Sequence, residues 1–151
     1  MNTSKPTDEI TLEFASRLQY LQLAGNLCRE VCHSIGLNSI DDEFINIIEL
    51  AVSEACTNVI KHSGLKDKGK IILLFQIYKD RLVTVVKDHG KGFDISQVPI
   101  PDFDKHTVGG YGIYLIKTQM DEVEYRVIDG WNILSMTRFF IRPDNSEAVK
   151  K

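Results

Sequence analysis

Three polar side chains with helical spacing are the first residues of this sequence that could do chemistry. Glu54, Asn58 and His62 follow one another at intervals of four residues. In a helix, residues four apart lie on neighbouring turns of one face, about 6 Å from one another. There a glutamate could act as a base, and the neutral oxygen of an asparagine could bind Mg²⁺, which prefers oxygen ligands and shares them with phosphates.

A glycine-rich segment, Asp88-His-Gly90-Lys-Gly92-Phe93, directly follows a predicted strand. Glycine lets the backbone turn sharply and lets a flat ring approach it closely. Asp88 stands at the end of the strand, where its carboxylate could accept a hydrogen bond from an exocyclic amino group. This segment therefore suggests one wall of a site for a planar ligand.

A second glycine-rich segment, Gly109-Gly110-Tyr111-Gly112-Ile113, opens a short predicted helix. The free N–H groups and the dipole of a helix N-terminus favour phosphate. Because no Gly-Lys-Ser/Thr follows these glycines, a Walker-type P-loop is excluded. The order of the elements also argues against a dinucleotide-binding fold.

Each motif also has an ordinary structural interpretation. Glu54 could be a surface residue and Asn58 an interior amide whose hydrogen bonds are satisfied. Asp and Gly dominate turns, and the second glycine segment could be a linker before a helix. Glu54 and Asn58 lie roughly 80–120° round the helix from its polar stripe, toward the core, where a carboxylate and an amide need partners.

The elements that must position these motifs follow from hydrophobic periodicity. A helical pattern ending at Gly36 precedes a second, longer one that begins near a Ser39–Asp42 capping box and ends before Gly64. The predicted strands are residues 10–15, 70–78, 81–87, 122–128 and 132–142, and a short helix spans residues 111–119. Tight turns at 79–80 and 129–130 join the later strands into hairpins.

This order, β-α-α-β-β-loop-α-β-β, predicts an α+β fold of two layers. Strand pairs joined by tight turns give a mostly antiparallel mixed sheet, and the helices cover one face of it. A chain of 151 residues is the size of one domain, with a core over about residues 10–142 and frayed ends.

Composition narrows the classes of function. The net charge is −3 and the basic residues are scattered, so nucleic-acid binding is not expected. No stretch approaches the roughly 20 apolar residues that span a bilayer, and the N-terminus has no signal-peptide core, so a cytoplasmic protein is expected. The three cysteines, Cys28, Cys32 and Cys56, fall in helical apolar patterns and are expected to be buried free thiols.

The order and spacing of the three motifs are more specific than any one of them. ExxxN on a helix, DxGxG after a strand hairpin and GxG at a helix start resemble the ATPase superfamily shared by gyrase, Hsp90, histidine kinases and MutL. The phrases VSEACTNVIKH and GGYGIYLIKTQMDEVEY look like its small bacterial anti-sigma-factor serine/threonine kinases. The resemblance covers residues 10–142 and implies a Bergerat-type ATP-binding fold.

This resemblance implies a role for each matching position. Glu54 would be the general base and Asn58 would hold Mg²⁺, while Asp88 would bind the adenine amino group. Further ATP-binding residues would be His62, Gly90, Gly92, Phe93, Gly109, Gly110, Tyr111, Gly112 and Ile113. Thr137, on the last strand, matches a threonine that helps to seat adenine in many relatives.

Residues 96–108 would form a lid over the ATP. Related kinases often carry an arginine just before the GxG helix start, whereas this chain has Thr107 and Val108 there. Lys105 and His106 are then the nearest candidates to contact the γ-phosphate.

The resulting expectation is an anti-sigma factor with Mg·ATP-dependent serine/threonine kinase activity. It would phosphorylate a small antagonist protein and sequester a sigma factor. Two alternatives stay open: an ATP-gated binding module with little catalysis, and a detached ATPase domain of a histidine kinase. A homodimer is also expected, with an N-terminal interface that uses strand 10–15 and the helix side chains Tyr20, Leu23 and Leu27.

Overall fold

The computed structural model describes residues 4–65, 68–92 and 112–141. Its five strands are β1 (Asp8–Ala15), β2 (Lys70–Ile77), β3 (Arg81–Asp88), β4 (Glu122–Ile128) and β5 (Trp131–Phe139). Its helices are the 3₁₀ turn η1 (Leu18–Tyr20), α1 (Leu21–Ile35), α2 (Asp42–His62) and α3 (Gly112–Gln119). The predicted order of elements is therefore confirmed.

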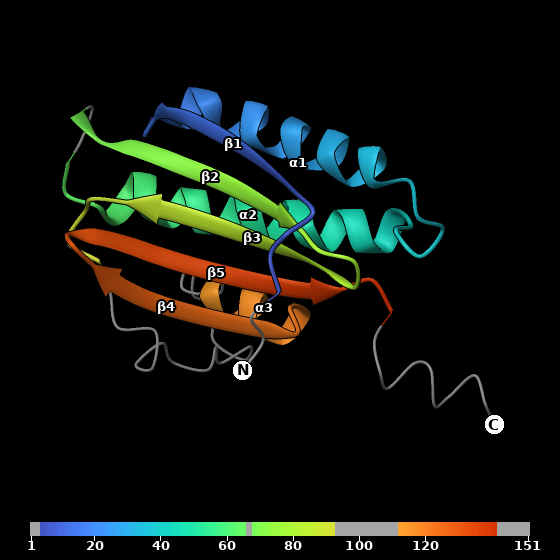
Figure 1. The fold of residues 1–151 in the computed structure, drawn as a ribbon. Helices are drawn as coiled ribbons and strands as arrows, with labels where there is room; N and C mark the ends of the chain where they lie inside the picture. Colours follow the sequence, from blue (N-terminus) through green and yellow to red (C-terminus); the bar gives the residue numbers. More distant parts are fainter. Residues whose placement is uncertain (1–3, 66–67, 93–111, 142–151) are drawn as a thin grey trace, which may run out of the picture.

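The strands form one sheet in the order β1-β2-β3-β5-β4, and every neighbouring pair is antiparallel. Figure 1 shows the sheet in front and all three helices behind it, which is the two-layer arrangement expected from the sequence. Strand β1 lies at one edge of the sheet and β4 at the other.

The core lies between the sheet and the helices. Side chains alternate along each strand, so every second residue faces the helix layer. On β3 and β5 these include Leu82, Val86, Leu134 and Met136, which all join the buried cluster. Central helix α2 lies over β3 and packs against both other helices.

The ends of the helices differ in part from the expectation. Gly36 ends α1 in the left-handed conformation, with φ of 75°, as predicted. The expected Ser39–Asp42 box is wrong, because the N-cap of α2 is Asp41, whose Oδ1 accepts a hydrogen bond from Phe44 N at 2.9 Å. An N-cap must bond to an N–H within the first turn, and Ser39 stands too early in the chain to do so.

The three cysteines are free and buried, as expected. Burial raises the pKa of the Cys56 thiol to about 12. Within the described parts of the chain, no helix is long and apolar enough to cross a membrane.

Candidate functional site

Two small adjoining cavities lie where the C-terminal half of α2 faces β3 and β5. The first, of about 20 Å³, is lined by Asn58, Val59, His62, Ser63, Asp88 and Gly92. The second, of about 10 Å³, is lined by Ala55, Asn58, Val59, Val86, Asp88, Ile113, Tyr125 and Leu134. Each is about the size of a single water. Asn58, Val59 and Asp88 border both, so residues predicted from separate motifs meet here.

Asp88 is the polar centre of this region. It ends β3 and is only 9% exposed. Its Oδ1 accepts hydrogen bonds from Gly90 N at 2.7 Å and from Asn132 Nδ2 at 3.1 Å. Both bonds use one oxygen, so Oδ2 keeps its capacity to accept a hydrogen bond from a ligand.

The glycines after Asp88 are required by close packing. A Cβ at Gly90 would lie 2.5 Å from Ser63 Cβ, and a Cβ at Gly92 would lie 2.7 Å from the hydroxyl of Tyr125. Gly92 also has φ of 74°, which side-chain-bearing residues rarely adopt. A hydrogen bond from Lys91 N to Ser63 O, 3.0 Å long, ties this loop to the end of α2.

The carboxylate of Glu54, a residue of α2, lies beside Gly112, the first residue of α3. A side chain at Gly112, the first residue of that helix, would collide with the Glu54 carboxylate. This carboxylate is half-buried and makes no hydrogen bond or ion pair with the residues that the structure describes. A glycine at position 112 therefore lets the Glu54 carboxylate approach the first turn of α3 closely.

The remaining predicted positions divide into two groups. His62 is exposed and lines the first cavity, while Ile113 is 7% exposed and forms an apolar wall of the second. Phe93, Lys105, Gly109, Gly110, Tyr111 and the expected lid 96–108 lie outside the described residues.

The structure does not bring Thr137 to these cavities. The register pairs Thr137 with Val83 and pairs Asn132 with Asp88, so Thr137 lies five residues further along β5, about 16 Å away. It also alternates with Met136 and therefore faces the side of the sheet opposite the helices. The expected role of Thr137 in seating adenine is not supported by its place in the fold.

The residue of β5 that lies beside Asp88 is Asn132. It is 3% exposed, and its Nδ2 donates to Asp88 Oδ1 and, at 2.7 Å, to Gly90 O. The alternation along β5 could have revealed it, because Asn132 shares its face with Leu134 and Met136. Tyr125 on β4, which lines the second cavity, was missed as well, since an apolar or aromatic residue in a strand carries no distinctive signal.

The lining, an apolar surface beside a carboxylate acceptor, matches the chemistry of a planar ring with an exocyclic amino group, whereas each cavity as described has room for about one water. Apolar side chains of Val86, Ile113 and Leu134 would pack on the ring, and Asp88 would accept from its amino group. The unpaired carboxylate of Glu54 lies beside the helix N-terminus that would face the phosphates.

Comparisons with known proteins identify the family of this chain. Residues 14–138 match the family model described as a histidine kinase-like ATPase domain. The chain is 34% identical to the serine-protein kinase RsbW of Bacillus licheniformis, over 91% of this chain and 89% of that protein. It is 32% identical to the enzyme of the same name from Bacillus cereus strain Q1, over 89% and 87% of the two chains.

Two solved structures share the fold. One contains the RsbU and RsbW domains of a Mycobacterium tuberculosis protein, with a TM-score of 0.65 at 19% identity, covering 89% of this chain and 33% of that one. The other is the histidine kinase domain of a blue-light-activated kinase from Erythrobacter litoralis, with a TM-score of 0.52 at 18% identity, covering 91% and 65%. The family model and the sequence relatives together show that this chain belongs to the histidine kinase-like ATPase family, in the branch of the RsbW serine-protein kinases.

Proposed function

We propose that this chain is a Mg·ATP-dependent serine/threonine kinase and anti-sigma factor. It would phosphorylate a small anti-sigma-factor antagonist and would sequester a sigma factor. The observation that carries the proposal is that two carboxylates in this region keep the capacity to accept a hydrogen bond. They are Asp88, at the cavities, and Glu54, beside the start of α3. A cytoplasmic location stays a prediction.

Asp88 is suited to select adenine. Its Oδ1 is held by Gly90 N and Asn132 Nδ2, which orients the carboxylate and leaves Oδ2 to accept from the amino group. Guanine presents a carbonyl oxygen at the corresponding position of its ring, and that oxygen would face Oδ2 without a proton between them.

Glu54 is suited to act as the base. Its carboxylate would accept the proton of the serine or threonine hydroxyl as the hydroxyl oxygen bonds to the γ-phosphorus of ATP and the bond from that phosphorus to the bridging oxygen breaks, which releases ADP. Asn58 lies one turn further along α2 and borders both cavities. Its amide oxygen would hold Mg²⁺ together with phosphate oxygens, and the bound ion would neutralise charge on the phosphates. Contact of Lys105 or His106 with the γ-phosphate stays a prediction.

Calorimetry with ATP and GTP tests the adenine assignment. An unsatisfied buried carboxylate costs about 1–3 kcal/mol, so GTP should bind at least about fivefold more weakly than ATP. Equal affinities for the two nucleotides would contradict the assigned role of Asp88.

A transfer assay tests the kinase assignment. The purified chain is incubated with Mg·ATP and a small antagonist protein encoded beside it, and mass spectrometry follows phosphorylation of serine or threonine. Stoichiometric phosphorylation is expected. If ATP binds but no transfer occurs, the chain is an ATP-gated binding module. A phosphohistidine on a partner would instead favour the histidine-kinase alternative.

We also propose that two copies associate through an N-terminal interface formed by edge strand β1 and helix α1. Of the three side chains expected at the interface, Tyr20 and Leu27 pack against the core, whereas Leu23 is 49% exposed and Leu18, in the preceding turn, is 59% exposed. Light scattering at micromolar concentration should report twice the 17.2 kDa of one chain. A monomer that persists with nucleotide present would rule out the dimer.

A further inference from the structure

The segment that follows β3 contains a side chain, His89, for which the proposed function gives no role. His89 is exposed and comes directly after Asp88. Side chains alternate along a strand, so Asp88 points toward the cavities and His89 toward the side of the sheet opposite the helices. There the His89 ring lies against the ring of Trp131, the first residue of β5, with centroids 3.3 Å apart and planes inclined by 39°.

A hydrogen bond holds the His89 ring in the same place. Its Nδ1 lies 3.2 Å from the carbonyl oxygen of Gly130, in the turn between β4 and β5. A carbonyl oxygen can only accept, so Nδ1 carries the proton that is shared. The imidazole is therefore fixed both by the ring of Trp131 and by the backbone of the turn before it.

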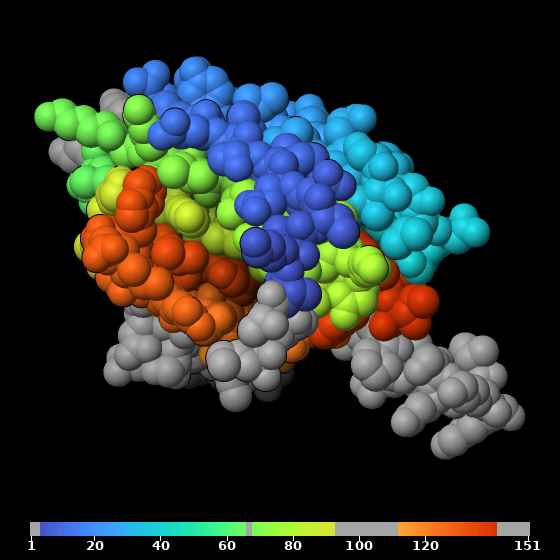
Figure 2. All heavy atoms as spheres, viewed as in Figure 1, coloured from blue at the N-terminus to red at the C-terminus, as the bar shows by residue number. Residues whose placement is uncertain are grey.

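Two successive residue pairs hold the end of β3 from opposite faces of the sheet. The register pairs Asp88 with Asn132, and His89 and Trp131 are the next residues opposite one another. On the helix side Asn132 Nδ2 donates to Asp88 Oδ1, while on the other side Trp131 holds His89. Figures 1 and 2 show the yellow end of β3 beside the orange turn between β4 and β5. Because Asp88 and His89 share a peptide unit, fixing the imidazole restricts the backbone that directs the Asp88 carboxylate.

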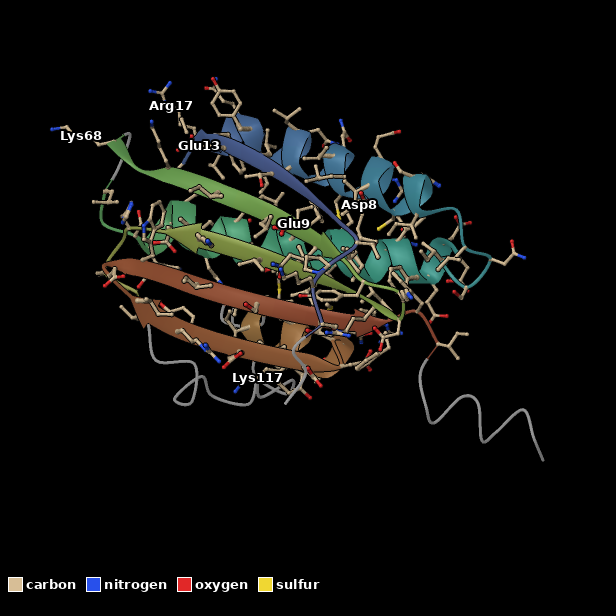
Figure 3. The ribbon with its side chains drawn as sticks, in the orientation of Figure 1. Asp8, Glu9, Glu13, Arg17, Lys68 and Lys117 are labelled. Atoms are coloured by element: carbon tan, nitrogen blue, oxygen red, sulfur yellow. The ribbon has the colours of Figure 1, made fainter. Side chains whose placement is uncertain are left out.

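The contact between His89 and Trp131 is one of rings and not of charges. His89 forms no ion pair with a residue that the structure describes. Besides Asp88, the charged residues within two positions of the pair, along the chain or across the ladder, are Lys87, Lys91, Arg126 and Asp129. Strand β2 separates β3 from the acidic side chains of β1 that Figure 3 labels. Protonation of the imidazole would strengthen the contact, because the face of an indole attracts a cation.

We propose that His89, through its contact with Trp131, is a positioning residue that orients Asp88 for adenine. This inference rests on the proposed function, since adenine must be the ligand of Asp88. Without the contact, the Asp88 carboxylate would sample more orientations. ATP would then bind more weakly, and the preference for ATP over GTP would fall. A residue that only supports the fold would change the unfolding temperature and leave that preference unaltered.

Calorimetry with ATP and GTP on the whole chain, well below its unfolding temperature, tests the positioning role. His89→Ala should lower ATP affinity about twofold to tenfold and should reduce the ratio of ATP to GTP affinity. His89→Phe keeps a ring against Trp131 and should restore most of the affinity. His33→Ala, which removes an exposed histidine of α1, is the matched control and should bind both nucleotides as the wild type does.

A double-mutant cycle tests whether His89 acts through Asp88. If it does, adding His89→Ala to Asp88→Asn should lower ATP affinity no further, because the carboxylate to be positioned is already gone. An undiminished further loss would mean that His89 affects the nucleotide by another route, and it would overturn the proposal.

Fluorescence reports directly on the contact, because Trp131 is the single tryptophan of the chain. A protonated imidazole quenches an indole that it touches, so wild-type emission should fall as the pH is lowered from about 8 to about 5, where histidine gains its charge. The fall should be absent in His89→Phe and should persist in His33→Ala. Emission of the wild type that does not depend on pH would overturn the contact, whatever the stability of the variants.

The outcomes separate this inference from the proposed function. A wild-type chain that binds neither nucleotide would overturn both. If the wild type prefers ATP and His89→Ala binds with the same affinity and the same preference, only the role of His89 is overturned.

Discussion

Two glutamates in the middle of helix α2 are in opposite situations. Glu49, which faces α1, lies 2.6 Å from Arg29 and has its charge satisfied inside the protein. Glu54, little more than one turn later, faces α3 and has no such partner among the described residues. The comparison shows how a stabilising polar contact differs from a binding site, because only the second leaves hydrogen-bonding capacity for a ligand.

The same contrast holds across the sheet. Asp88 and Asn132 pair across β3 and β5 at the cavities, yet Asp88 Oδ2 stays available. At the other end of β5, Asp121 Oδ2 accepts from Phe139 N at 2.8 Å and so helps to close the end of the strand. Both aspartates are anchored, and Asp88 is the one of the two that borders the cavities beside α2.

The largest effect should come from replacing Glu54 with glutamine, compared with the same replacement at Glu49. Glu54→Gln removes the base but keeps shape and packing, so phosphotransfer should fall about a hundredfold to ten-thousandfold while ATP still binds. Glu49→Gln is the matched control: it breaks the ion pair with Arg29 at a cost of about 1 kcal/mol or less and should leave transfer intact. The measurement is the initial rate of phosphorylation of an antagonist substrate. Wild-type turnover by Glu54→Gln would show that Glu54 is not the base.

Next in size is the effect of Asp88→Asn on binding. The new amide can keep an oxygen toward Gly90 and Asn132, but it presents an NH₂ where the adenine amino group needs an acceptor. Loss of a charged hydrogen bond costs about 1.5–3 kcal/mol, so ATP affinity should fall roughly tenfold to a hundredfold by calorimetry. Asp129→Asn, an exposed change in the nearby turn, is the control. Comparable losses in both variants would show a non-specific charge effect.

A smaller effect is expected from Asn132→Ala. Asp88 and the Gly90 carbonyl would each lose a buried donor, which costs about 1–3 kcal/mol shared between folding and ATP binding. Thermal unfolding and calorimetry should therefore both shift. A variant with lower stability and undiminished ATP affinity would show that Asn132 supports the fold without orienting Asp88.

The smallest effect is expected from Thr137→Val. Thr137 faces the side of the sheet opposite the helices, five residues from Asn132, so removal of its hydroxyl should alter ATP affinity by less than about twofold. A loss as large as that of Asn132→Ala would mean that the threonine of the relatives does correspond to Thr137, against the register of β5.

Much of the fold could be predicted from the sequence because its signals are local. Helical periodicity places Glu54 and Asn58 on one face, Gly36 ends α1, and Asp129-Gly130 turns the last hairpin. The motif spacing was enough to identify the ATPase family, since each motif keeps its own residue types. The prediction that Ser39 caps α2 was wrong because Asp41 and Asp42 follow it closely. Sequence spacing alone does not decide which of these three residues is the N-cap.

What only the tertiary structure decided is which distant residues meet. The pairing of β3 with β5 puts Asn132, and not Thr137, beside Asp88, and a shift of one residue in a strand turns a side chain to the other face. The collision that makes Gly112 necessary involves Glu54 on another helix, so no local pattern reveals it. Local periodicity therefore determined the elements and their faces, whereas register and packing between elements determined the site.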